Sequence, residues 1–166
     1  MLKELLEKYL KENLFPKKEK KSLIGKNFSL SKSYNLEESL AGESISSYIN
    51  ENREDENFQT KLFSLIDSKK LKDSDVYKKV NIDRRLFSKI RSNKDYHPSK
   101  ETVILLGIAL ELSEEEIEKL LELSSYSLPK NNTYDLIIRF CFKERIYDLN
   151  QINDFLYDHD CKLLNV

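Results

Sequence analysis

The residues best suited to chemistry in this sequence are cations that are crowded near the middle of the chain. Between Asn57 and Lys100 there are twelve Lys and Arg residues against five Asp and Glu residues. Between Glu101 and Leu128 the balance is reversed, with seven Glu residues against one Lys. Clustered cations suit the binding of phosphate groups or of an acidic protein surface. Nucleic acid, a protein partner and a solvated surface are therefore the alternatives for the basic stretch.

Residues typical of catalysis or of metal binding are scarce. There is no glycine-rich phosphate loop and no Gly-x-Ser-x-Gly nucleophile motif. His97 is expected in a loop, and His159 lies between two aspartates that cannot all point at one ion. Cys141 and Cys161 lack metal-type neighbours and are expected to be reduced structural thiols. We therefore predict no enzyme activity, no metal site and no cofactor.

Composition and hydropathy favour an all-α protein of the cytoplasm. Three glycines and three prolines leave few turn signals, whereas Leu, Ile, Lys and Glu are abundant. The longest apolar run, Val103 to Leu110, is shorter than the ~20 residues that cross a bilayer. The chain opens with Leu alternating with Lys and Glu, unlike a signal peptide. We expect no membrane association.

The first 55 residues are predicted to form one region. Leu2, Leu5, Leu6, Tyr9 and Leu10 recur at helical spacing and predict an amphipathic helix over residues 2–13. From residue 22 to residue 55 the pattern weakens, and a short helix over 36–40 or over 45–49 is possible. Most of 22–55 is expected to be extended, mobile or dependent on a partner for order.

Residues 56–166 are predicted to form a helical domain with a core over 56–128. A first helix begins near Phe58, and Asp73 or Ser74 is expected to cap a second one that stops at Asn81. Asp83 is expected to cap the third helix. That helix places Leu86, Phe87 and Ile90 inward and Arg84, Arg85, Ser88, Lys89 and Arg91 outward.

Three further patterns complete this domain. Ser99 is expected to cap a helix that is apolar on every side and therefore central. Ser113 and Glu116 form a capping box before a helix that exposes its glutamates. Two helices over the extension 129–166, the first capped by Asn132, either extend the core or supply a dimer surface.

This order of elements resembles the helix-turn-helix family of Cro and the phage repressors, also called the xenobiotic-response-element family. The matching residues are Val76, the Asn81-Ile82-Asp83 turn, Phe87, Ile90, Pro98-Ser99-x-x-Thr102 and the Ala109-Leu110 pair before Leu112. The resemblance covers about 70 of the 166 residues. The region from Phe58 onward also looks like a helical module that recurs at the C-termini of otherwise unrelated bacterial proteins.

The resemblance implies a repressor-like domain of five helices, with two extra C-terminal helices and an N-terminal helical arm. It further implies a sequence-specific transcriptional regulator that binds double-stranded DNA with the helix over 83–92 in the major groove. Arg84 and Arg85 would contact base edges, with Ser88 and Lys89 one turn later. The phosphate contacts would be Lys78, Lys79, Arg91 and Lys94.

The alternative is a non-catalytic protein-interaction module, an adaptor or inhibitor, with the same fold. Asp73 and Tyr77 favour this alternative, whereas Arg84 and Arg85 favour DNA. A protein partner or a second copy of the chain would bind through residues 1–13 or 133–158.

Overall fold

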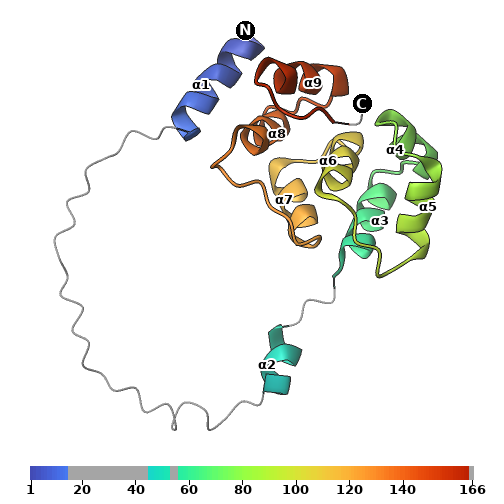
Figure 1. Ribbon diagram of the computed structural model, residues 1–166. Helices are drawn as coiled ribbons and strands as arrows, with labels where there is room; N and C mark the ends of the chain where they lie inside the picture. Colours follow the sequence, from blue (N-terminus) through green and yellow to red (C-terminus); the bar gives the residue numbers. More distant parts are fainter. Residues whose placement is uncertain (15–44, 53–55, 165–166) are drawn as a thin grey trace, which may run out of the picture. The chain divides into compact units, whose positions relative to one another are not determined.

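The computed structural model describes residues 1–14, 45–52 and 56–164 (Figure 1). Across these ranges the regular structure is entirely α-helical, which confirms the all-α prediction. The helices are α1 Leu2–Leu14, α2 Ile45–Asn52, α3 Phe58–Ser68, α4 Asp73–Lys79, α5 Arg84–Ser92, α6 Lys100–Ala109, α7 Glu114–Glu122, α8 Thr133–Lys143 and α9 Leu149–Asp158.

Helix α2 belongs to a separate compact unit from the other helices. It agrees with one of the two short helices considered for residues 22–55, and its apolar side chains Ile45, Tyr48 and Ile49 are exposed. The other candidate, over residues 36–40, lies outside the described residues. Most of the segment 22–55 that was expected to be extended or mobile likewise lies outside the described residues.

Helix α6 lies at the centre of the larger unit, as its apolar sequence predicts. Every residue from Thr102 to Ala109 is buried, and the helix packs against both α4 and α7. Gly107 permits close approach of α7 and α8. A Cβ atom at this position would lie 2.5 Å from Cδ1 of Ile117 and 3.1 Å from Cζ of Phe142.

Most helices of this unit begin at a side-chain N-cap, where a polar oxygen accepts a hydrogen bond from an otherwise unpaired backbone N–H. The caps observed are Asn57, Asp83, Ser99, Ser113, Asn132 and Asp148. The cap expected at Asp73 or Ser74 is wrong. Lys72 occupies the N-cap of α4 without a side-chain hydrogen bond, because the helix begins one or two residues earlier than expected.

Helices α3, α4, α6, α7, α8 and α9 end in the same way, with a residue of positive φ that precedes an apolar one. The positive-φ residues are Lys70, Asn81, Glu111, Ser125, Arg145 and Asp160. The next residue's N–H then bonds back to the carbonyl five positions earlier, as from Leu112 to Gly107 over 3.1 Å. Only Asn81 was predicted to adopt this left-handed conformation.

Helix α1 packs on α8, in the same compact unit as residues 56–164 (Figure 1). Leu6 and Leu10 are buried, and the ring of Tyr9 lies 5.4 Å from that of Phe140. Lys3 also forms an ion pair of 2.6 Å with Asp158 of α9. The apolar stripe of residues 2–13 is therefore covered largely by the chain itself.

The C-terminal helices extend the core, which was one of the two alternatives expected for this tail. The apolar residues Leu136, Ile137, Ile138, Phe140, Cys141, Phe142, Ile152, Phe155 and Leu156 are all buried. Burial raises the pKa of the Cys141 thiol to about 12, so this group stays protonated at neutral pH. Among the described helices, none has the length and apolar character needed to cross a bilayer.

Candidate nucleic-acid interface

The α4–turn–α5 segment, residues 73–92, carries most of the residues proposed for binding. Asn81 takes φ of 52°, and the N–H of Ile82 donates to the carbonyl of Tyr77 over 2.8 Å. Asp83 then caps α5, its Oδ1 accepting from the backbone N–H of Arg85 at 2.7 Å. A left-handed residue followed directly by a new N-cap makes the chain reverse direction within a few residues.

Apolar side chains fix α5 against the rest of the unit. Five positions of the segment are no more than 6% exposed, namely Val76, Val80, Ile82, Phe87 and Ile90. The ring of Phe87 lies 6.1 Å from that of Phe63 and 5.6 Å from that of Tyr77. Tyr77 is therefore half-buried against α5 and does not point away from it. With this face buried, the opposite face of α5 is turned outward.

The N-terminal half of α5 presents two arginines. The side chains of Arg84 and Arg85 are exposed, and within the described residues neither of them makes an ion pair or a hydrogen bond. Ser88 is also exposed, one turn after Arg84. These two guanidinium groups are thus available to a ligand.

The C-terminal half of α5 is more constrained. Nη2 of Arg91 lies 2.5 Å from Oδ1 of Asp73, and its guanidinium carbon is 4.0 Å from the ring centroid of Phe63. Gln59 donates from Nε2 to the carbonyls of Ile90, at 2.9 Å, and Arg91, at 2.6 Å. These contacts connect α3, α4 and α5 through one arginine.

A hollow of about 310 Å³ lies between the first turn of α4 and the outward face of α5. It brings three predicted site residues, Arg84, Ser88 and Arg91, together with Asp73 and Tyr77. Because the hollow depends on how α4 crosses α5, the sequence alone indicated only the α5 side of it. The spacing of residues 84, 88 and 91 on one helical face was the available signal.

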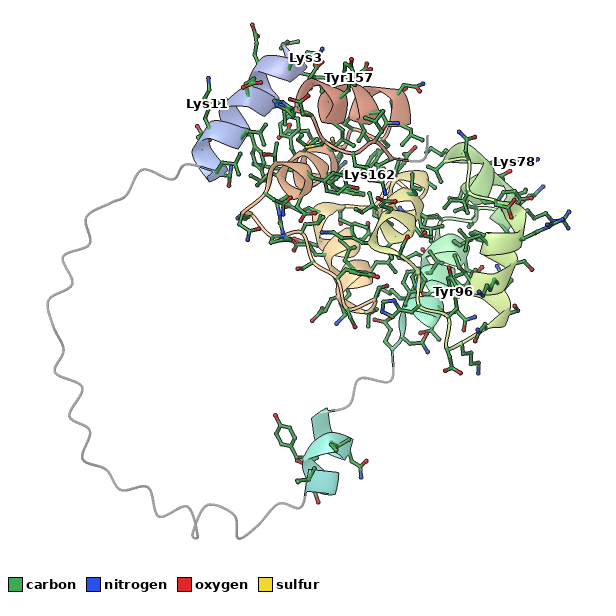
Figure 2. The ribbon with its side chains drawn as sticks, in the orientation of Figure 1. Lys3, Lys11, Lys78, Tyr96, Tyr157 and Lys162 are labelled. Atoms are coloured by element: carbon green, nitrogen blue, oxygen red, sulfur yellow. The ribbon has the colours of Figure 1, made fainter. Side chains whose placement is uncertain are left out.

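The other predicted cations lie in different surroundings. Lys79 is directed to the opposite side of α4, where its Nζ lies 2.5 Å from Oε1 of Glu111 and lowers the pKa of that carboxyl. Nζ of Lys89 lies 4.9 Å from the ring centroid of Tyr96. Lys78 and Lys94 are exposed. Lys78 lies at the outer edge of α4, and Tyr96 follows the far end of α5 (Figure 2).

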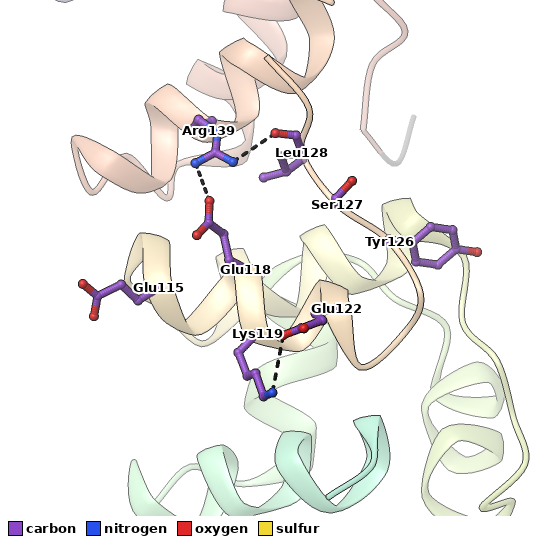
Figure 3. Close-up of a pocket in the computed structure, with 8 residues that line it drawn as sticks. All are labelled: Glu115, Glu118, Lys119, Glu122, Tyr126, Ser127, Leu128 and Arg139. Atoms are coloured by element: carbon purple, nitrogen blue, oxygen red, sulfur yellow. Dashed lines mark hydrogen bonds and ion pairs between the residues drawn. The ribbon is translucent and has the colours of Figure 1, made fainter. Parts of the chain in front are cut away.

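The acidic helix α7 is neutralised in part by an arginine of α8 (Figure 3). Nη1 of Arg139 lies 2.7 Å from Glu114 and also pairs with Glu118, while Nη2 donates to the carbonyl of Leu128 at 3.0 Å. Burial acts to lower the pKa of Arg139, but the hydrogen bonds to both glutamates outweigh it and raise the pKa. These glutamates were expected to face solvent, and the part played by Arg139 was not predicted from the sequence.

A cavity of about 450 Å³ lies beside this cluster, between α7 and the chain that leads into α8. Figure 3 shows Arg139 directed toward Glu118, and Lys119 paired with Glu122 at 3.4 Å. Because carboxylates and cations alternate in its lining, the cavity has no strong net charge. It therefore contrasts with the outward face of α5, where the cations predominate.

No group of histidine, cysteine and carboxylate side chains suited to a metal ion occurs in the described part of the chain. His159 instead faces Glu7 of α1, with 3.6 Å between Nε2 and Oε1. Comparison with known proteins adds nothing further: no family model, no curated protein and no solved structure matches this chain.

Proposed function

We propose that the chain is a DNA-binding protein of the repressor-like helix-turn-helix type. In this proposal α4 and α5 are the two helices of the motif, and α3, α6 and α7 complete its five-helix domain. Helix α5 enters the major groove of double-stranded DNA as the recognition helix. The protein would act as a sequence-specific transcriptional regulator.

The observation that carries the proposal is the position of Arg84 and Arg85 in the first turn of α5. The N-terminus of a helix carries a partial positive charge, so cations are unfavourable there by about 0.3–1 kcal/mol each. Both arginines are exposed, and no carboxylate among the described residues pairs with them. Two residues that oppose helix stability and have no internal partner are best explained by an anionic ligand.

The proposed contacts divide into two classes. Arg84 and Arg85 would donate to base edges, guanine being the base that suits a bidentate guanidinium. Lys78 and Lys94 would contact phosphates, which are present along every duplex and carry no sequence information. Ser88 and Lys89, one turn further along α5, would contact either bases or phosphates.

Binding to duplex DNA tests the proposal. Preferred duplexes are selected from a randomised pool, and affinity is then measured by fluorescence anisotropy between about 50 and 200 mM salt. Arg84→Ala and Arg85→Ala should each cost about 1–3 kcal/mol on the selected sequence and little on an unselected one. Lys78→Ala should weaken binding to the selected and the unselected duplex equally. It should also flatten the slope of log affinity against log salt by about one unit.

Lys130→Ala is the matched control, because Lys130 is an exposed lysine of the loop between α7 and α8. It removes the same charge without touching α5 and should leave binding unchanged. Intact protein that gives flat curves on every duplex at about 100 mM salt would overturn the proposal.

A second candidate function, protein interaction, is favoured by one observation. The carboxylate of Asp73 and the ring of Tyr77 lie in the same hollow as Arg84, which suits a mixed protein surface. On this alternative the intact chain does not bind duplex DNA. Arg84→Ala would instead disrupt a complex with another protein.

A further inference from the structure

The hollow between α4 and α5 brings together donors that bind anions. Arg91 supplies a guanidinium group, and Ser74, Ser88 and Tyr77 supply hydroxyl groups. Guanidinium and hydroxyl groups are the usual side-chain donors to phosphate oxygens. One residue of the lining is negatively charged: Asp73 contributes a carboxylate that is paired with Arg91.

We infer that this hollow is a phosphate-binding subsite that the chain fills with its own carboxylate, Asp73. The ligand class is a phosphodiester of the DNA backbone, so the inference rests on the proposed function. Asp73 competes with that phosphate for Arg91. It thereby lowers the affinity of the protein for every duplex without changing which sequence is preferred.

In the ion pair between Asp73 and Arg91, another anion could replace the carboxylate. Both side chains are partly exposed, 36% for Asp73 and 49% for Arg91, and exposed ion pairs are weak. Arg91 is also held over Phe63 from its other side, so its guanidinium keeps its place if the carboxylate leaves. A phosphate could therefore occupy the same donor without rearrangement of α5.

The test is Asp73→Asn, which keeps the shape of the side chain and removes its charge. Arg91 then becomes one more phosphate contact, so the slope of log affinity against log salt should steepen by about 0.9. At about 100 mM salt a change of that size raises affinity roughly tenfold. The measurement is anisotropy with one duplex across a salt series.

Asp75→Asn is the matched control. Asp75 also lies in the first turn of α4, but it lines a different hollow with Lys79 and Glu111. Both substitutions remove one charge and one favourable acid from the helix N-terminus, so their effects on helix stability should match. Asp75→Asn should change affinity by less than about twofold.

Arg91→Ala completes the design as a double-mutant cycle. Arg91→Ala should cost about tenfold more duplex affinity in the Asp73→Asn background than in the intact one, because in the intact protein Asp73 competes for the same guanidinium group. In the Asp73→Asn background it should abolish the tenfold gain. Thermal unfolding of each variant checks that the fold is retained.

The outcomes separate this inference from the proposed function. If intact protein binds duplex DNA and Asp73→Asn changes neither affinity nor slope, the inference is wrong and the proposed function stands. Equal gains from Asp73→Asn and Asp75→Asn would also overturn it, because net charge alone would then explain the effect. If neither the intact protein nor Asp73→Asn binds, the proposed function fails and the inference fails with it.

Discussion

Helices α5 and α7 are the same length, nine residues each, and each begins at a side-chain N-cap, but their charges are opposite. The first turn of α7 carries Glu114, Glu115 and Glu116, which complement the positive end of the helix dipole. The first turn of α5 carries Arg84 and Arg85, which oppose it. Arg139 pairs with two glutamates of α7, whereas Arg84 and Arg85 lack ion pairs within the described residues.

The difference separates charges that stabilise the fold from charges that need another explanation. The acids of α7 are accounted for by the helix dipole and by α8, so no ligand has to be invoked for them. Arg84 and Arg85 weaken their own helix and form no ion pair within the described residues that would offset the loss. Charge count alone would have ranked the two helices equally as binding surfaces.

The largest expected loss of stability comes from Leu106, on the central helix of the unit. Leu106 is fully buried in α6, which packs against α4 and α7. Leu106→Ala should lower the free energy of unfolding by about 2–5 kcal/mol, measured by urea denaturation. Leu5→Ala, at a side chain that is 42% exposed, is the control and should cost far less. A loss below about 1 kcal/mol at Leu106 would contradict the central position of α6.

The next largest loss of stability is expected from a substitution at Gly107, where α6 packs against α7. Gly107→Ala places a Cβ atom 2.5 Å from Cδ1 of Ile117, and overpacking of this kind costs about 1–3 kcal/mol. This loss should exceed the gain of about 1 kcal/mol in helix propensity. Adding Ile117→Val, which removes that Cδ1 atom, should recover part of the loss. Strictly additive losses in the double variant would show that the two atoms do not meet.

Arg139→Ala tests whether the charges of α7 are part of the fold. The substitution leaves Glu114 and Glu118 without their cation and the Leu128 carbonyl without its donor. A loss of about 1–2 kcal/mol is expected, near the low end for charged hydrogen bonds because both glutamates are partly exposed. Arg84→Ala, measured by the same urea titration, should cause no loss. Equal losses at the two arginines would remove the distinction between the helices.

The smallest expected change in the free energy of unfolding should have opposite signs in α5 and α7. Arg85→Ala removes a cation from the first turn of α5 and should raise the free energy of unfolding by about 0.3–1 kcal/mol at low salt. Glu115→Ala removes an acid from the first turn of α7 and should lower it by a similar amount. Both changes should shrink as salt is added, since the dipole interaction is screened. A loss of stability with Arg85→Ala would show that Arg85 serves the fold and would weaken the argument for a ligand.

Local features of the fold were predictable because they depend on residues close together in the chain. The apolar spacing located the helices, and the caps at Asp83, Ser99 and Ser113 were identified from their types and positions. The left-handed turn at Asn81 was predicted because asparagine tolerates that conformation. The same conformation at Glu111 and Arg145 was not predicted, because there the packing of the next apolar residue overrides the local preference.

The place of the N-terminal helix depended on tertiary structure. Its amphipathic pattern predicted that one apolar face would be buried, but such a pattern does not specify the surface against which the face packs. The division expected at residue 55 separated this helix from the later ones, whereas in the structure α1 packs on α8. The reason is that apolar burial is non-directional, so any apolar groove of suitable shape can satisfy it.

The sequence by itself determined which residues are charged, which helix carries them and which face of that helix turns outward. Only the tertiary structure decided which of those charges have partners. Arg91 meets Asp73 across 18 residues, and Arg139 meets Glu114 across 25. An ion pair requires two groups within a few ångströms, and for residues so far apart in sequence that distance is set by how the helices cross.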